Sequence, residues 1–263
     1  MTELHCGKFY FGGQFFFSLT VLTFLIITYK KKVLNSFYLS GLPGLIAGTI
    51  LSLGFCGYVI AMYSTTVANT NFIISLQILF LAIFGYFFLK EKISFVTLFS
   101  IILAIIGVLI MVGNSLSPGE MSGNLAAFSM PITFAVLIVI VRKYPTIDMV
   151  PAQFIAGICC CLIGYFISNK IMISYHDIFL GFLAGFFQVG FGFIFITIGA
   201  RTTPSAMVGI IMISESVLGP LWAFLFASER PSIFSLIGGA IILSAVLLQF
   251  YTLLNKRKKS VSH

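Results

Sequence analysis

The chain has 263 residues, of which 59% are hydrophobic and only 8% are charged, with a formal net charge of +8. Soluble domains carry about 25% charged residues, so this composition excludes a soluble globular protein and indicates an integral membrane protein. The basic residues lie in short connections between apolar runs and not in one surface patch, which argues against nucleic acid as a partner.

Nine apolar runs follow one another along the chain, and each is long enough to cross a bilayer. A helix rises 1.5 Å per residue and the hydrocarbon core is about 30 Å thick, so about 20 residues suffice. The runs are apolar on all sides, which favours helices over the alternating strands of a barrel. The predicted spans are residues 11–29, 43–63, 68–89, 95–112, 123–141, 150–167, 178–200, 205–227 and 233–254.

The distribution of basic residues predicts the orientation of these spans. If the basic tail at residues 255–263 is cytoplasmic, 12 of the 15 lysines and arginines fall on the cytoplasmic side. Only Lys8, Lys170 and Arg230 then lie outside. Basic residues favour cytoplasmic loops, so we expect a multi-pass protein of the inner or plasma membrane with a cytoplasmic C-terminus.

The chain repeats itself at an offset of 138 residues, and the repeated junctions fall on opposite sides of the membrane. This predicts two inverted repeats, residues 11–112 with four spans and residues 123–254 with five. The span at 123–141 would pair with residues before Met1, so a first helix is expected to have been lost or to lie upstream. The matching pairs are Leu45 with Leu183, Gly54 with Gly192, Phe55 with Phe193, Thr65 with Thr203, Ala68 with Ala206, Glu91 with Glu229 and Ser94 with Ser232.

Glu215 is the only acidic side chain in the interior of a predicted span. A carboxylate at bilayer depth costs roughly 2.5–3.5 kcal/mol on insertion scales, so such a group usually faces a bundle interior or a wet cavity. It is therefore a candidate to attract a substrate amine or to exchange a proton. The alternative is an interhelical hydrogen bond that only stabilises the bundle.

Four further side chains are candidates for the same binding or coupling site. Gln77 is the repeat partner of Glu215, and Asn71 lies nearly two turns away on the same span; both are equally consistent with structural hydrogen bonding. Gln188 lies on a glycine-rich span and is expected to line the cavity. Trp222, the only tryptophan, shares a helix side with Glu215 at an offset of seven.

Motifs of enzymes and metal sites are absent from the sequence. It has no HExxH, no pair of carboxylates inside spans and no glycine-rich phosphate loop after a strand. The three histidines are dispersed, and the five cysteines show no CxxC spacing, which is typical of packing residues. We therefore expect no catalytic residue, no metal and no cofactor.

Two related segments, residues 61–94 and 199–232, carry a family resemblance. Each is a span with a small-residue start that ends in a glutamate beside a basic residue, followed by a serine. The chain thus resembles EamA-type members of the drug/metabolite transporter superfamily. The resemblance implies an all-α, ten-helix fold that here lacks its first helix. It also implies secondary-active transport of a small polar metabolite, such as an amino acid, a nucleotide-derived compound or a cation, by alternating access.

Two other functions stay open at this stage. The chain could be a non-transporting membrane protein, either an N-terminally truncated fragment or a subunit that a partner completes. It could also be a flippase of lipid carriers, as the resemblance includes small proteins of that kind. The expected partners are a small-molecule substrate and the lipid bilayer, and a homodimer is an assembly to be tested.

Overall fold

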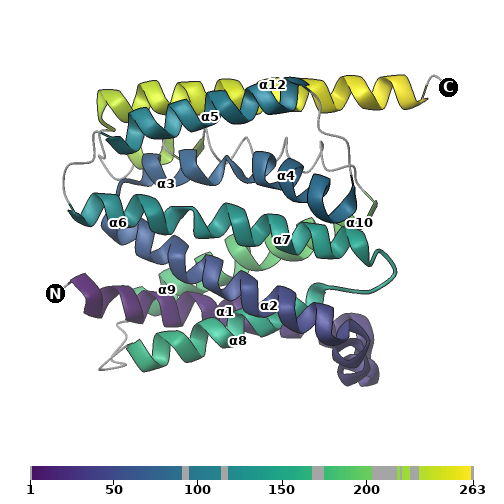
Figure 1. Cartoon of the computed structure of the whole chain (residues 1–263). Coiled ribbons are helices and arrows are strands. Elements are labelled where there is room, and N and C mark those ends of the chain that lie inside the picture. Colours follow the sequence, from purple (N-terminus) through teal and green to yellow (C-terminus); the bar gives the residue numbers. More distant parts are fainter. Residues whose placement is uncertain are drawn as a thin grey trace. The chain divides into compact units, whose positions relative to one another are not determined.

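The computed structural model describes residues 2–90, 95–113, 118–167, 175–202, 218–219, 221–225 and 231–261, and the elements in these ranges are helices without a strand (Figure 1). In chain order they are α1 (Thr2–Tyr29), η1 (Lys30–Lys32), α2 (Val33–Ser64), α3 (Val67–Ile74), α4 (Gln77–Leu89), α5 (Phe95–Gly113), α6 (Pro118–Ala127), α7 (Ser129–Lys143), α8 (Val150–Ile167), α9 (Tyr175–Phe182), η2 (Leu183–Phe191), α10 (Gly192–Thr202) and α12 (Ile233–Val261).

Four helical stretches in the described residues are long and apolar enough to cross a membrane, which confirms an all-helical, multi-pass membrane protein. Three shorter apolar helices accompany them. Eight predicted spans coincide with helices, whereas the span at 205–227 lies mostly outside the described residues. The count of nine therefore stays a prediction. The long stretches are Gly12–Ser64, Val67–Leu89, Glu120–Lys143 and Tyr175–Arg201, and the shorter helices are Phe95–Ile110, Val150–Phe166 and Ile233–Leu248.

Two of the helical stretches are interrupted, one at a sharp bend and one at a tight turn. Helix α2 bends at Gly41, which has φ of +50° and ψ of −149°, two residues before Pro43. Only glycine adopts such a conformation without strain, so the first turns of α2 form a separate short helix. The second break separates α3 from α4 at Ser75 and Leu76, inside the predicted span 68–89.

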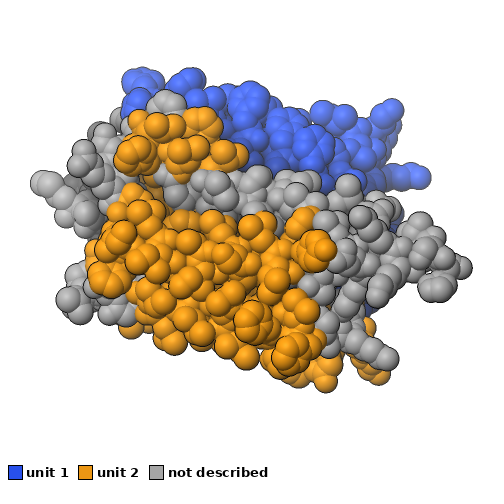
Figure 2. Space-filling model, turned by 90° about the horizontal axis from the view of Figure 1, so that it is seen from above, with its two compact units in different colours: residues 1–59, 136–202 blue, residues 60–135, 203–263 orange. Residues whose placement is uncertain are grey.

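The chain divides into two compact units, and each combines segments from both halves of the sequence. Unit 1 contains residues 1–59 and 136–202, and unit 2 contains residues 60–135 and 203–263 (Figure 2). Contacts within each unit therefore join the two halves of the sequence, such as those of Gly157 with Ser18 and of Gly107 with Gly238.

Small residues allow the helices of unit 1 to approach closely. Gly185 of η2 faces the backbone of Gly13 in α1, where any β-carbon would overlap the Gly13 carbonyl oxygen. Gly157 of α8 likewise faces Ser18 of α1, and a β-carbon there would lie 3.0 Å from the Phe17 ring. Such small-residue contacts are the usual way in which membrane helices pack. The Phe17 ring also meets Phe55 and Phe193, with centroids 5.5 and 6.2 Å away.

Unit 2 is built around the pair α5 and α12. A β-carbon added to Gly107 would lie 2.8 Å from the carbonyl oxygen of Gly238 and 2.9 Å from the Ile242 side chain. Helix α3 adds Phe72 to the same core, and its ring lies against Gly239 of α12. Around these contacts the core is aliphatic and fully buried at Ile73, Ala104, Ile242, Ala245 and Val246.

Candidate functional site

The polar interruption between α3 and α4 lies in the interior of unit 2. Thr66 caps the start of α3, because its hydroxyl oxygen accepts a hydrogen bond from a backbone N–H three residues on, at 3.1 Å. At the far end, the Ser75 hydroxyl donates to the Phe72 carbonyl at 2.6 Å, just before the turn. Residues 68–79 are all buried. Ser75 and Leu76 keep right-handed helical dihedral angles, with ψ of −20° and −10°, so this turn tightens the helix locally and its polar side chains lie in the interior of unit 2.

The side chain of Asn71 lies directly over Gly219. A β-carbon added to Gly219 would lie 2.6, 2.7 and 2.8 Å from three atoms of the Asn71 carboxamide, so only glycine permits this contact. The Asn71 amide also donates to the carbonyl of Val67 in its own helix at 2.9 Å. Gly219 follows Glu215 by one helical turn in the sequence. Glu215 itself, our first candidate, lies outside the described residues.

Gln77 opens α4 and carries an unsatisfied donor. Its side chain is only 4% exposed. Within the part of the chain that the structure describes, its amide nitrogen Nε2 has no hydrogen-bond partner. A buried donor without a partner costs about 1–3 kcal/mol, and few such groups occur in native proteins. This amide is therefore available to a ligand.

The two remaining candidates are exposed and belong to different units. Gln188 lies in unit 1 within η2, a nine-residue π-helix between α9 and α10. π-helical turns are rare and occur frequently at functional sites. Trp222 lies in unit 2, three residues after Gly219, and is 51% exposed.

The structure also contains a charged cluster that the sequence analysis missed. In unit 1, the Asp148 carboxylate accepts hydrogen bonds from the Tyr29 hydroxyl and from the Arg201 guanidinium, with which it forms an ion pair. It also accepts from the backbone N–H of Val150 at 3.1 Å, which caps the start of α8. The ends of α1 and α10 are thus joined to the start of α8.

A second polar contact joins α8 to α10 one turn deeper. The side-chain amide of Gln153 donates to the Phe193 carbonyl at 2.7 Å and to the Thr197 hydroxyl. Gln153 is fully buried. From the sequence, Arg201 was expected only to be a charge that orients the chain in the membrane, and neither Asp148 nor Gln153 was predicted to form a polar contact. The signal in the sequence that could have indicated this ion pair was an acidic and a basic residue at the ends of neighbouring spans.

A third polar cluster joins α6 to the start of α3 in unit 2. The Thr65 hydroxyl donates to the Asn124 side-chain oxygen at 2.8 Å, and the Asn69 amide donates to both residues at 3.3 Å. The cluster ties α6 to the start of α3, although the Asn69 side-chain oxygen Oδ1 is buried without a hydrogen-bond partner among the described residues.

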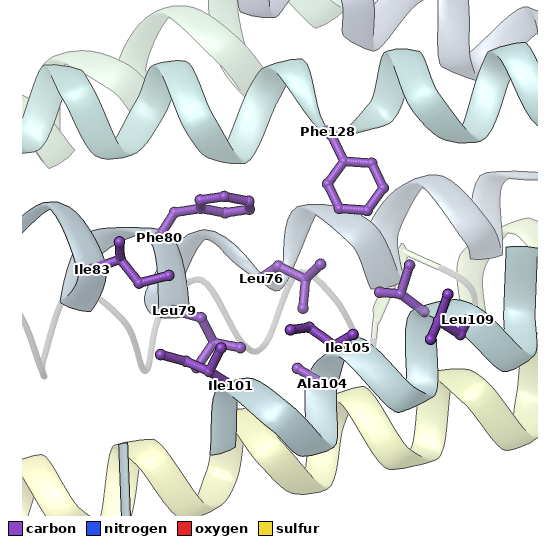
Figure 3. Close-up of a pocket in the computed structure, with 10 residues that line it drawn as sticks. Leu76, Leu79, Phe80, Ile83, Ile101, Ala104, Ile105, Leu109 and Phe128 are labelled. Atoms are coloured by element: carbon purple, nitrogen blue, oxygen red, sulfur yellow. The ribbon is translucent and has the colours of Figure 1, made fainter. Parts of the chain in front are cut away.

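An apolar pocket of about 270 Å³ lies beside the interruption in unit 2 (Figure 3). The turn residue Leu76 and residues of α4 and α5 point into it, and Phe128 faces them. No polar side chain lines this pocket, so it suits a hydrocarbon group and not a charged one. Its lining residues are Leu76, Leu79, Phe80, Ile83, Ile101, Ala104, Ile105, Val108, Leu109 and Phe128.

Among the described residues, no three His, Cys, Asp or Glu side chains are grouped so that they could hold a metal ion. The described part of the candidate site therefore offers amide and hydroxyl groups. Such groups bind polar organic molecules through hydrogen bonds.

The chain matches the EamA-like transporter family twice, over residues 8–113 and again over residues 117–251. It is also 24% identical over 205 residues to an uncharacterized transporter of Methanothermobacter thermautotrophicus. That alignment covers 71% of this chain and 57% of the relative, so the chain spans little more than half of the relative's length.

A solved crystal structure supports the fold. It is 18% identical in sequence, has a TM-score of 0.66, and the match covers 92% of this chain and 87% of the other. At this identity the likeness concerns the fold alone.

Proposed function

Because the chain belongs to the EamA-like transporter family, we propose that it is a secondary-active transporter that moves a small polar metabolite across the cell membrane by alternating access. The observation that carries this proposal is the buried amide of Gln77 at the turn between α3 and α4, which has no hydrogen-bond partner among the described residues. Binding sites of inverted-repeat transporters typically lie near the middle of the membrane, where Gln77 falls within its predicted span.

Glu215 would supply the charge of this site. The predicted topology makes the spans 68–89 and 205–227 antiparallel, and Asn71 meets Gly219 between them. In an antiparallel pair, one turn forward along the first span matches one turn back along the second. The register therefore favours a Glu215 at the level of Ser75, on the side of the helix that carries Asn71. A carboxylate there would bind a substrate amine or a coupling proton.

The inverted repeat is the second part of the proposal. The family matches each half of the chain separately, which supports two related repeats. The offset of 138 residues maps Gly107 onto Ala245, and it maps Ser100 onto Gly238. Gly107 and Gly238 approach closely between α5 and α12, and Ser100 and Ala245 are fully buried on the same two helices. Small residues at symmetry-related positions are expected if a pseudo-two-fold axis relates the two helices.

Flux measurements in vesicles test this proposal. The full chain is reconstituted and assayed with amino acids, nucleosides and organic cations, in parallel with its Glu215→Gln variant. We expect flux of one of these classes, lowered about tenfold or more by the substitution, since a hydrogen bond to a charged group contributes about 1.5–3 kcal/mol.

The matched control is Glu120→Gln, the same chemical change at an exposed residue in the first turn of α6. This variant should retain the flux of the unmodified protein. Equal flux and equal pH dependence in the Glu215→Gln variant and the unmodified protein would show that Glu215 has no role in transport. Absence of flux with every substrate class would contradict the proposed function.

A further inference from the structure

The first turns of α2 form a short helix that is set off from the spans of unit 1. Two left-handed residues bound it, because Lys30 and Gly41 both have φ of +50°. A lysine in this conformation is strained, which marks a sharp and specific turn. Figure 1 shows this short helix end-on, whereas α1 and α8 of the same unit run across the view. Residues 31–40 therefore run in a different direction from these two helices.

One face of this short helix is anchored to the protein. The Phe37 ring packs edge-on against Phe154 of α8, with centroids 5.5 Å apart. Ser36 and Ser40 lie on the same side and are 4% and 1% exposed, and each hydroxyl donates to a carbonyl of its own helix. The helix is thus docked on unit 1 through a defined face.

The opposite face is exposed and mostly apolar, with Asn35 as its polar member. Leu34 and Tyr38, one turn apart, are each 84% exposed, and Leu39 beside them is 61% exposed. The three consecutive lysines 30–32 are also exposed and directly precede this face. Exposed apolar and aromatic side chains next to a basic cluster, on a short helix that sharp turns separate from the spans, are the pattern of a helix that lies in the membrane interface.

We propose that residues 30–40 are an interfacial anchor that binds the anionic lipids of the surrounding bilayer. Leu34 and Tyr38 insert at the boundary between headgroups and acyl chains, and Lys30, Lys31 and Lys32 contact the negatively charged headgroups. Charge complementarity favours anionic lipids as the ligand, because the segment carries three positive charges and no negative one. The inference rests on the membrane location of the chain and is independent of its substrate.

The depth of the apolar face is the first measurement. In the full chain, with its five native cysteines replaced, a nitroxide is attached to Tyr38→Cys or, as the control, to Lys31→Cys. We expect the label at position 38 to collide more often with oxygen, which concentrates in lipid, than with a water-soluble nickel chelate. The label at position 31 should show the reverse. A label at position 38 that is as accessible to nickel as the one at position 31 overturns the proposal.

The choice of anionic lipid is the second measurement. Association of spin-labelled phosphatidylglycerol is compared with that of spin-labelled phosphatidylcholine for the unmodified chain and for K30Q/K31Q/K32Q. The preference for phosphatidylglycerol should fall at least about fivefold, which is what a single lysine near an anionic surface contributes. The control K256Q/K258Q/K259Q removes the same charge from the C-terminal tail. An equal fall in both triple variants would mean that net charge alone attracts the lipid, and the proposal would fail.

Discussion

Gln77 has a buried amide that the protein itself does not satisfy among the described residues. Such a group lowers the stability of the protein unless a ligand accepts a hydrogen bond from it. Replacing it with an apolar side chain should therefore raise stability and impair transport. Gln14 offers a comparison, because its side-chain oxygen is also buried and without a partner in the described part of the chain.

We expect Gln77→Leu to raise the free energy of unfolding by about 1 kcal/mol, since leucine fills a similar volume and removes the unsatisfied donor. The same substitution should abolish flux in vesicles. The Gln14→Leu variant should gain a similar free energy of unfolding and should transport at the normal rate. Thermal unfolding and flux measured on the same preparations distinguish these outcomes. Full transport by Gln77→Leu would make Gln77 a structural residue.

Gln77 and Asn71 could be identified from the sequence because polar residues are rare inside apolar spans. The structure adds that both are buried in unit 2 and that Asn71 meets Gly219. This contact was not predictable, because it depends on which helix faces which. Asp148 and Arg201 were missed for the same reason, since each is unremarkable at a span end until the fold brings them together.

At the level of elements, the ion pair of Asp148 and Arg201 joins helices of unit 1 that are distant in sequence. The two side chains are 16% and 24% exposed, so the pair is largely desolvated. Removing one partner leaves the other charge without compensation, which costs more than the pair itself contributes.

We expect Arg201→Met to lower the free energy of unfolding by about 2 kcal/mol, because Asp148 would stay buried without its cation. Adding Asp148→Asn to this variant should recover part of the loss. The control is Lys31→Met, which removes an exposed charge nearby and should change stability little. Chemical denaturation in detergent measures all three variants. A loss in Arg201→Met no larger than in the control would contradict the role of the pair.

The glycines of the helix pairs differ sharply in what surrounds them. Gly107 has backbone of α12 within 2.8 Å of where its β-carbon would be, whereas Gly192 in α10 has nothing within 4 Å. We expect Gly107→Ala to destabilise the protein by about 1–3 kcal/mol through overpacking. Gly192→Ala should be neutral or up to about 1 kcal/mol stabilising, because alanine is the better helix former. Equal effects in thermal unfolding would show that α5 and α12 do not need this close contact.

The ends of the helices could be predicted from the apolar runs and the polar residues that separate them, so most helices agree with the predicted spans. The breaks within the helices could not be predicted in the same way. The turn at Ser75 and the π-helix η2 lie inside continuous apolar runs, where no proline marks them. Gly41 and Pro43 were visible in the sequence, but their combination could not show that the turns before them form a separate helix.

For the whole molecule, the topology is the prediction with the widest consequence. We expect Ser260→Cys to react with an impermeant thiol reagent only after the membrane is opened, and Ser117→Cys to react from outside without this treatment. The reason is the concentration of basic residues on one predicted side. Both variants are made in a background without the five native cysteines. The reverse pattern of labelling would invert the topology.

The class of the molecule could be predicted from composition alone, because 8% charged residues are incompatible with a soluble domain. The division into units could not. Our predicted repeats divide the chain once, near residue 115, whereas the compact units exchange segments between the two halves. Packing of one half against the other is a long-range property that local patterns do not encode.

This exchange of segments has a consequence for biosynthesis. Residues 1–59 pack with residues 136–202, so the first helices enter the bilayer before the ribosome has made their partners. At about 5–20 residues per second, this delay is on the order of ten seconds. Gly157 and Gly185 therefore reach Ser18 and Gly13 only after those surfaces have been exposed to lipid or to an insertase. We expect the early helices to depend on membrane insertion factors, and unit 1 to assemble before unit 2.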